Sequence, residues 1–177
     1  MENVISNEKT DEIKLQNAKN IITSMLNEFD LYVSKGHGPF LASIYDKNNN
    51  LIAKCANSVV LDNCSNNHAE MNTIKEAQIK LKTYDLSSYD LSIYITAEPC
   101  IMCLGAIMWS GIKEVYYSVS SKKVEEITGF DEGFKQNWFE EFKKRGIVVY
   151  GNIESKLGEE KLKEYVRQNK TIYKPKR

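Results

Sequence analysis

Three side chains of metal-binding type stand in two short motifs, His68-Ala69-Glu70 and Pro99-Cys100-Ile101-Met102-Cys103. Each motif follows a predicted loop or strand and opens a predicted helix. Cys100 and Cys103 are three positions apart, so they share one helix face and both sulfurs can bind one ion. Both cysteines belong to the first helical turn, where the helix dipole favours a thiolate.

His68 adds a neutral imidazole nitrogen to the two thiolates. Zinc with three protein ligands keeps its fourth position for water, which is typical of catalytic rather than closed structural sites. The metal lowers the pKa of this water to about 7 and so makes hydroxide available at neutral pH. The sequence therefore predicts one Zn²⁺ per chain, bound by His68, Cys100 and Cys103.

Glu70 shares a helix face with three apolar residues, Ile74, Ala77 and Leu81. We therefore expect its carboxylate to point inward, near the metal. A carboxylate there can take a proton from the metal-bound water and pass it to a leaving ammonia. The combination of H-x-E with P-C-x-x-C is the signature of zinc-dependent base deaminases.

Other interpretations of the cysteines are possible. The C-x-x-C pair could be a redox motif, although the preceding proline and the distant H-x-E fit that poorly. Cys64, four residues before His68, could close the site as a structural Cys₃His zinc centre, but an inward-facing Glu70 would then have no partner. We prefer to interpret Cys55 and Cys64 as small buried residues.

Composition limits the class of protein. The 177 residues predict one domain, and a hydrophobic content of 42% can form a packed core. Lys plus Arg and Asp plus Glu both number 24, which argues against a dedicated nucleic-acid binder. No apolar run approaches the roughly 18 residues of a membrane span. The polar N-terminus is unlike a secretory signal, so we expect a cytoplasmic protein with reduced cysteines.

Periodicity predicts strands that alternate with helices after an initial hairpin, an α/β layered domain with a mixed sheet. Residues 1–9 are expected to form a loose tail. The expected strands are 40–46, 51–57, 91–97, 114–120 and 146–151. The expected helices are 10–30, 69–84, 100–110, 121–128, 134–145 and 153–168. The core spans about 10–151, and residues 152–177 form a C-terminal segment.

From about residue 15 to 135 the chain resembles the cytidine deaminase-like superfamily, and within it most closely the bacterial guanine deaminases. Glu98 before the proline is typical of the purine-type branch, which includes guanine and tRNA adenosine deaminases. The resemblance implies a three-layer α/β/α sandwich with a central mixed five-stranded sheet. It is carried by Gly38-Pro39-Phe40, Ala56-Asn57-Ser58, His68-Ala69-Glu70, TAEPCIMCLGAIMW at 96–109 and Gly129-Phe130-Asp131-Glu132.

The resemblance also implies roles for substrate-binding residues. Asn57 and the backbone at Ala69 would hold the ring, and Phe40 and Trp109 would form aromatic walls around it. Asp131 and Glu132 would act together, with the second acid contacting the ring and shuttling a proton. The family usually has aspartate at the second position, so Glu132 leaves room for another amino-heterocycle. Without the resemblance, Phe40 and Trp109 would be interpreted as core residues. For Asp131 and Glu132, solvated loop acids are the alternative interpretation.

The resemblance implies deamination of guanine to xanthine and ammonia, and we expect a free purine base to be preferred over RNA. A tRNA adenosine deaminase is the nearest alternative, and a non-catalytic zinc-stabilised module is disfavoured by Glu70. The resemblance and the apolar 101–109 helix predict a homodimer or a larger symmetric assembly. The resemblance also implies that the C-terminal segment closes the site as a lid, and that this lid is exchanged between the subunits. Residues 161–177 carry seven Lys or Arg and one acid, a basic stretch that could meet RNA but is more commonly a solvated tail.

Overall fold

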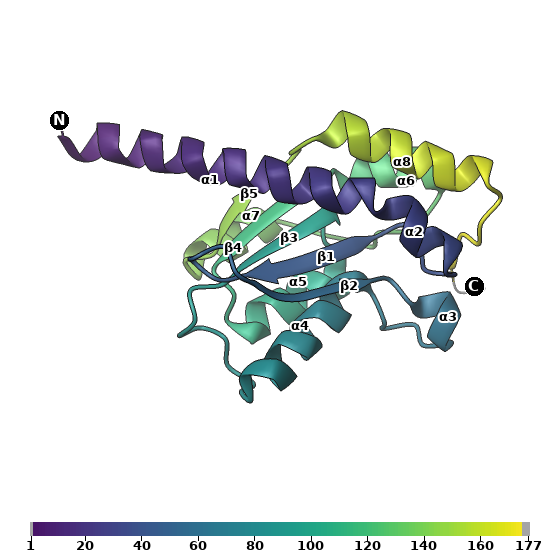
Figure 1. The fold of residues 1–177 in the computed structure, drawn as a ribbon, viewed down its shortest axis with the longest axis horizontal. Coiled ribbons are helices and arrows are strands. Elements are labelled where there is room, and N and C mark those ends of the chain that lie inside the picture. Colours follow the sequence, from purple (N-terminus) through teal and green to yellow (C-terminus); the bar gives the residue numbers. More distant parts are fainter. Residues whose placement is uncertain (1, 175–177) are drawn as a thin grey trace.

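The computed structural model describes residues 2–174, and the side chains of residues 11–174. Helices cover both faces of a central sheet, as Figure 1 shows. One face carries α4 (Ala69–Leu81) and α5 (Ile101–Ser110). The other carries α1 (Glu2–Asn27), α6 (Ser121–Thr128) and α8 (Ser155–Arg167). The expected α/β/α sandwich is confirmed.

The sheet has five strands in the order β2-β1-β3-β4-β5. β1 pairs antiparallel with β2 and with β3, whereas β3–β4 and β4–β5 are parallel pairs. The strands are β1 (Leu41–Tyr45), β2 (Leu51–Ala56), β3 (Ser92–Ala97), β4 (Glu114–Val119) and β5 (Val148–Tyr150). The sheet is therefore mixed, as the alternation of elements predicts.

The two central parallel strands explain where the functional motifs lie. β3 and β4 are buried along almost their whole length, as expected for strands covered by helices on both faces. α5 connects them and begins directly after the carboxyl end of β3. Crevices at the carboxyl ends of parallel strands are the usual ligand sites of α/β sheets. The turn with Pro99 and Cys100 lies at that edge.

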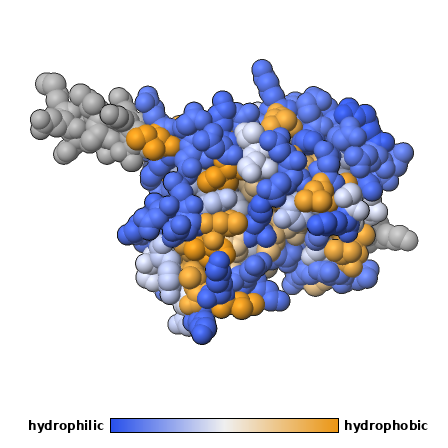
Figure 2. Space-filling model, viewed as in Figure 1, coloured by the Kyte–Doolittle hydropathy of each residue, from blue (hydrophilic) through white to orange (hydrophobic). Residues whose placement is uncertain are grey.

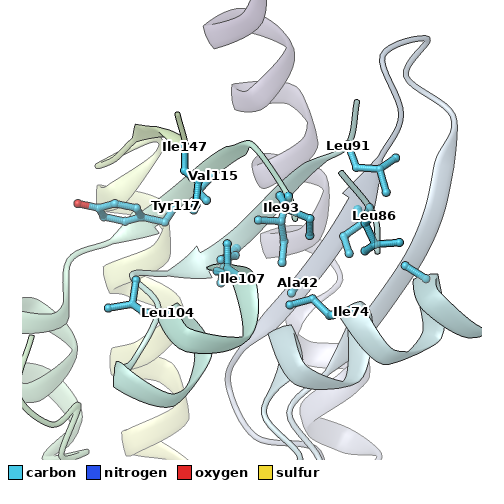
Figure 3. Close-up of a cluster of buried hydrophobic side chains, with 14 of the residues drawn as sticks. Ala42, Ile74, Leu86, Leu91, Ile93, Leu104, Ile107, Val115, Tyr117 and Ile147 are labelled. Carbon is cyan, nitrogen blue, oxygen red and sulfur yellow. The ribbon is translucent and has the colours of Figure 1, made fainter. Parts of the chain in front are cut away.

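A large apolar core fills the space between the sheet and the α4/α5 layer. Figure 3 shows Ile93 and Val115 from the sheet together with Ile74 and Ile107 from the helices. A second core lies under α1, where Ile22 and Met25 are buried. The cores hold the two helix layers rigidly against the sheet, so the starts of α4 and α5 are fixed relative to each other.

Several local expectations were wrong. Residues 1–9 were expected to be a loose tail, but α1 already begins at Glu2, because no glycine or proline interrupts the run. The first helix ends at Asn27 and a short helix α2 (Phe29–Ser34) follows. The expected loop before His68 contains a single-turn helix α3 (Val59–Asp62).

The helix expected over 134–145 is shorter, since α7 spans Trp138–Lys144. Gly133 and Asn137 both have left-handed backbone conformations, with φ of 73° and 55°, which interrupt a right-handed helix. Residues 129–137 therefore form an irregular segment. Among the described residues, none of the helices has the length and apolar character of a membrane span. Figure 2 shows a mostly hydrophilic surface on the face drawn in Figure 1.

Candidate active site

The metal-binding side chains project from the first residues of two neighbouring helices. His68 is the N-cap residue of α4 and Cys100 the N-cap residue of α5, and both have extended backbone conformations. Their carbonyl groups accept the first helical hydrogen bonds, from Asn72 and Leu104. Because α4 and α5 pack against each other on the same sheet face, the two caps meet at one edge of the sheet.

The distances within this cluster fit a metal ion. The Nδ1 atom of His68 lies 3.5 Å from Cys100 Sγ and 3.7 Å from Cys103 Sγ. The three ligand atoms all lie within 4.8 Å of one another. Tetrahedral zinc, with Zn–N of about 2.0–2.1 Å and Zn–S of about 2.3 Å, separates nitrogen from sulfur by about 3.5 Å. The donor set and its spacing are therefore those of a zinc site with three protein ligands.

The other two cysteines take no part in this cluster. The Cys64 thiol donates to Asn66 Oδ1 at 2.8 Å, and the Cys55 thiol donates to Glu76 Oε2 at 2.9 Å. Both are only partly buried, rather than fully buried as expected. Among the residues whose side chains the structure describes, no fourth protein ligand joins the cluster. This arrangement disfavours a closed structural Cys₃His site.

The two clustered thiols differ in their protonation. A hydrogen bond from Cys103 and the neighbouring His68 lower the pKa of Cys100 to about 4, although burial opposes this shift. The same hydrogen bond and burial raise the pKa of Cys103 well above its usual value. Cys100 is therefore ready to bind a cation as a thiolate, and Cys103 must release a proton when it does so.

Glu70 points inward, as its helix position predicts. It is 6% exposed and lines the same cavity as His68 and Cys100. Burial raises the pKa of Glu70 to about 6, and the negative charge of Cys100 acts in the same direction. A carboxyl group with such a pKa can exchange protons near neutral pH. Its place beside the cluster suits a proton shuttle.

A cavity of about 220 Å³ opens beside the cluster and brings together side chains from distant parts of the chain. The four predicted residues Phe40, Asn57, Asp131 and Glu132 all contribute to its wall. The complete lining is Phe40, Asn57, His68, Glu70, Ile95, Ala97, Glu98, Cys100, Ile101, Phe130, Asp131, Glu132, Gly133, Tyr173 and Lys174. Most residues of the predicted site therefore meet in one cavity.

The structure does not bring Trp109 or Ala69 to this cavity. Trp109 is 83% exposed near the far end of α5. It lies nine positions after Cys100, roughly 13 Å along the helix axis, so it cannot form a wall of the cavity in its own chain. The Ala69 side chain is fully buried in the core, and the role of its backbone in holding the ring stays a prediction. Phe130 occupies the position of an aromatic wall instead, with its ring edge-on to Phe40 at a centroid distance of 5.3 Å.

Asn57 is held so that its amide group faces the cavity. Its backbone N–H donates to the Phe40 carbonyl, and its carbonyl accepts from Gly38 N–H, both at 2.9 Å. Its side-chain Oδ1 accepts from Val59 N–H at 3.2 Å, which leaves Nδ2 without a partner among the described residues. A Cβ atom on Gly38 would lie 2.7 Å from Oδ1, so a glycine is needed there. Asn57 is thus a preset hydrogen-bond donor.

Glu132 and Asp131 lie on the irregular segment after α6. Glu132 is 9% exposed, and burial raises its pKa to about 8, although the Lys135 ammonium opposes the shift. Asp131 is exposed at the cavity mouth, where its Oδ1 accepts from Gly133 N–H at 2.9 Å. The two acids therefore differ in environment, and only Glu132 is a buried carboxyl group that is mostly protonated at neutral pH.

Three residues in or beside the cavity were not identified from the sequence. Phe130 stands inside the phrase that carried the resemblance, but its aromatic role was not identified. Tyr173 packs edge-on against His68 at a ring-centroid distance of 6.4 Å, and an aromatic residue in a basic tail was its only signal. Lys135 forms a buried ion pair with Glu98 at 3.3 Å, and nothing in its sequence context distinguishes it from surface lysines.

Comparison with known proteins agrees with this geometry. The sequence model of the cytidine and deoxycytidylate deaminase zinc-binding region matches residues 15–119, more than half of the chain. The guanine deaminase of Bacillus subtilis is 40% identical over 97 residues, which are 55% of this chain and 60% of that protein. A tRNA-specific adenosine deaminase of Rickettsia bellii is 37% identical over 99 residues, 55% of this chain and 67% of that protein. The first of these alignments thus spans less than two thirds of the relative's length.

Two solved structures share the fold. A guanine deaminase from Nitrosomonas europaea has a TM-score of 0.78 and 35% identity, with 81% of each chain covered. A structure in complex with 2,6-diaminopurine has a TM-score of 0.83 and 34% identity, covering 89% of this chain and 85% of that one. With its His/Cys/Cys cluster and buried Glu70, the chain belongs to the cytidine and deoxycytidylate deaminase zinc-binding family.

Proposed function

We propose that this protein is a zinc-dependent aminohydrolase that converts guanine and water to xanthine and ammonia. One observation carries the proposal: the buried carboxyl group of Glu70 shares a cavity with the His68/Cys100/Cys103 cluster and with groups suited to hold a flat base. The similarity to guanine deaminases of two bacteria supports the choice of base.

His68, Cys100 and Cys103 would hold the zinc ion, which when bound supplies a water molecule of lowered pKa. Glu70 would accept a proton from the attacking water, whose oxygen bonds to the amino-bearing ring carbon, and would deliver that proton to the amino group, which leaves as ammonia. A structural zinc site has no use for such a carboxyl group. The inward position of Glu70 therefore supports a catalytic centre over a zinc-stabilised binding module.

The remaining wall residues bind and orient the base. Phe40 and Phe130 offer apolar ring surface to a flat heterocycle. Asn57 Nδ2 donates a hydrogen bond to a ring acceptor. Glu132, protonated at neutral pH, can donate to a ring nitrogen and move a proton during the reaction. Because the Glu132 side chain is one methylene longer than the usual aspartate, aminopurines other than guanine belong in any substrate screen.

The C-terminal segment supplies the cover of this cavity. Tyr173 and Lys174 line it, and the Tyr173 hydroxyl donates to the Ser65 carbonyl at 3.3 Å. The Tyr165 hydroxyl donates to the Thr171 carbonyl at 2.9 Å and ties the segment to α8. We propose that residues 168–174 exclude water from the reacting base as a lid on the single domain. This contact is made within one chain, and exchange between subunits stays a prediction from the resemblance.

A tRNA adenosine deaminase is the second candidate, favoured by the similarity to enzymes of that name. Such an enzyme must admit a nucleotide that remains attached to RNA, with cations near the phosphates. Asp131 at the mouth and Tyr173 over the cavity favour a free base instead.

We also propose a homodimer. Trp109 and Phe134 are 83% and 80% exposed, and large apolar side chains so exposed are candidates for a subunit interface. Sedimentation at micromolar concentration tests this proposal, and a monomer there would contradict it.

The decisive experiment is an ammonia-release screen of the zinc-loaded protein against guanine, other aminopurines, triazines, nucleosides and an anticodon stem-loop RNA. We expect kcat/KM to be highest for guanine. A higher value for the RNA would overturn the choice of a free base, whereas release from another aminopurine alone would reassign only the role of Glu132.

A further inference from the structure

Lys135 is a charged residue buried beside the cavity but not part of its lining. Its side chain is 8% exposed. Its Nζ atom donates to the Pro99 carbonyl at 2.9 Å, to Glu98 Oε1 at 3.3 Å and to the Ser121 hydroxyl. An ammonium group has three N–H bonds, and all three are used. A buried ammonium costs considerable free energy unless it is paired in this way.

Two of the three acceptors belong to the turn that carries Cys100, and the third, Ser121, is hydrogen-bonded to that turn. Glu98 and Pro99 directly precede Cys100, and Ser121 is the first residue of α6. Ser121 N–H donates to Glu98 Oε2 at 3.0 Å, so both carboxylate oxygens of Glu98 are bonded. Lys135 therefore attaches residues 129–135 of the irregular segment to the turn that carries Cys100.

Glu132 lies on the same segment, three residues before Lys135. Its Oε2 atom is 4.0 Å from the Lys135 ammonium, too far for a hydrogen bond but close enough for electrostatic attraction. Because all three N–H bonds of the ammonium are donated to other acceptors, it forms no hydrogen bond with the Glu132 carboxyl group. That group stays available to a ligand in the cavity.

The first part of the segment is held by local contacts. It contains no helix or strand, and both Gly129 and Gly133 have left-handed backbone conformations. Gly129 N–H donates to the Glu125 carbonyl at 2.9 Å, Phe130 N–H to Thr128 Oγ1 at 3.1 Å and Glu132 N–H to Glu125 Oε1 at 3.2 Å, and Phe130 packs in a core cluster. Beyond Gly133, the hydrogen bonds of the Lys135 side chain hold the segment in place.

We propose that Lys135 is a positioning residue that holds Glu132 at the cavity wall for purine binding, through the Glu98–Pro99 turn and Ser121. The inference rests on the proposed function in one respect, namely that Glu132 contacts the base. Lys135 itself touches neither base nor metal, so its effect on the base must pass through Glu132.

A double-mutant cycle tests this dependence. The variants are Lys135→Met, Glu132→Gln and the two combined, with Lys122→Met as a matched control on the exposed face of α6. We expect Lys135→Met to lower kcat/KM for guanine roughly tenfold in the parent protein but less than twofold when Glu132 is already Gln, because residues that act as a unit are non-additive. Zinc content stays at the parent level, and Lys122→Met changes neither value.

Equal losses in the two backgrounds, or loss of zinc in Lys135→Met, would overturn the proposal, since a purely structural role predicts either. If Lys135→Met does not fold, Ser121→Ala removes one acceptor and takes its place in the cycle. It should cause a smaller loss that again disappears in the Glu132→Gln background, and a loss that persists there would refute the positioning role.

A binding measurement separates this inference from the proposed function. If the parent protein does not release ammonia from guanine, the same cycle is measured on the dissociation constant of 2,6-diaminopurine by calorimetry. Non-additive constants then support the role of Lys135 although guanine deamination has failed. Additive constants overturn that role, and an absence of binding of either purine overturns both.

Discussion

The two walls of the cavity are built in different ways. The wall with His68, Glu70 and Cys100 comes from the starts of α4 and α5, two helices packed on the sheet by the largest core of the molecule. The opposite wall comes from the irregular segments 129–135 and 168–174, held by a few side-chain contacts such as those of Lys135 and Tyr173.

This difference suggests different main roles for the two walls, with metal binding and proton transfer at the helix starts and selection of the base at the loops. Groups on rigid helix starts can be held within a fraction of an ångström, which metal binding and proton transfer require. Groups on loops change position and identity at little cost to the fold, which suits selection among bases. We therefore expect substitutions in the helix-start wall to abolish the reaction, and substitutions in the loop wall to lower kcat/KM by smaller factors or to change substrate preference.

The largest effect should follow removal of a metal ligand. Cys100→Ala leaves two protein ligands, so we expect strongly reduced zinc and no measurable turnover. Elemental analysis and ammonia release measure both quantities. Cys64→Ser is the matched control, because the Cys64 thiol bonds to Asn66 outside the cluster, and it should keep metal and activity. Full zinc in Cys100→Ala would refute the ligand assignment.

Removal of the proton carrier should come next. Glu70→Ala keeps the three ligands, and we expect kcat to fall by roughly 10²–10⁴-fold or more, the usual contribution of general acid–base catalysis. Zinc content, by elemental analysis, should match the parent protein. Glu70→Gln, which retains the shape, should be nearly as inactive. A near-normal kcat in either variant would remove Glu70 from the mechanism.

The loop wall should respond more mildly. Truncation after Asn169 removes Tyr173 and Lys174 but keeps α8, whose Leu162 and Tyr165 are buried in the fold. We expect KM for a free base to rise and kcat to fall, because the open cavity admits water, while zinc stays bound. Steady-state kinetics with zinc analysis measure this. If the truncated enzyme matches the parent in both constants, the segment is not a lid.

The smallest effect concerns stability and pH. Burial raises the pKa of Glu132 to about 8, whereas an unfolded glutamate titrates near its usual 4.5. Between these values the native state holds a proton that the unfolded state lacks, so the contribution of Glu132 to the free energy of unfolding falls as pH rises from about 4.5 to 8. Glu132→Gln lacks this contribution and should become relatively more stable across that range.

Denaturant titrations at pH 5.5 and pH 8, at equal zinc loading, measure the difference in unfolding free energy between Glu132→Gln and the parent. A difference that is independent of pH would mean that Glu132 titrates normally in the folded protein. The loop wall would then be more open to solvent than the structure indicates.

Much of this molecule follows from local sequence rules. The H-x-E and P-C-x-x-C motifs, each at a predicted helix start, predicted the three side chains that the structure brings together, His68, Cys100 and Cys103. The apolar face of α4 indicated that Glu70 points inward. Alternating strands and helices predicted the mixed sheet. These signals work because ligand spacing and helix periodicity are properties of a few neighbouring residues.

Only the tertiary structure decided how the opposite wall is made. Trp109 is an aromatic residue that could form a cavity wall, but it lies near the far end of α5, away from the cavity. Phe130 forms the aromatic wall beside Phe40 instead. Lys135 joins the site through its hydrogen bond to Pro99, which is 36 positions away in the sequence. Tyr173 joins it through its hydrogen bond to Ser65, which is 108 positions away. Such contacts depend on how packed elements bring distant segments together, and no local pattern of residues encodes that proximity.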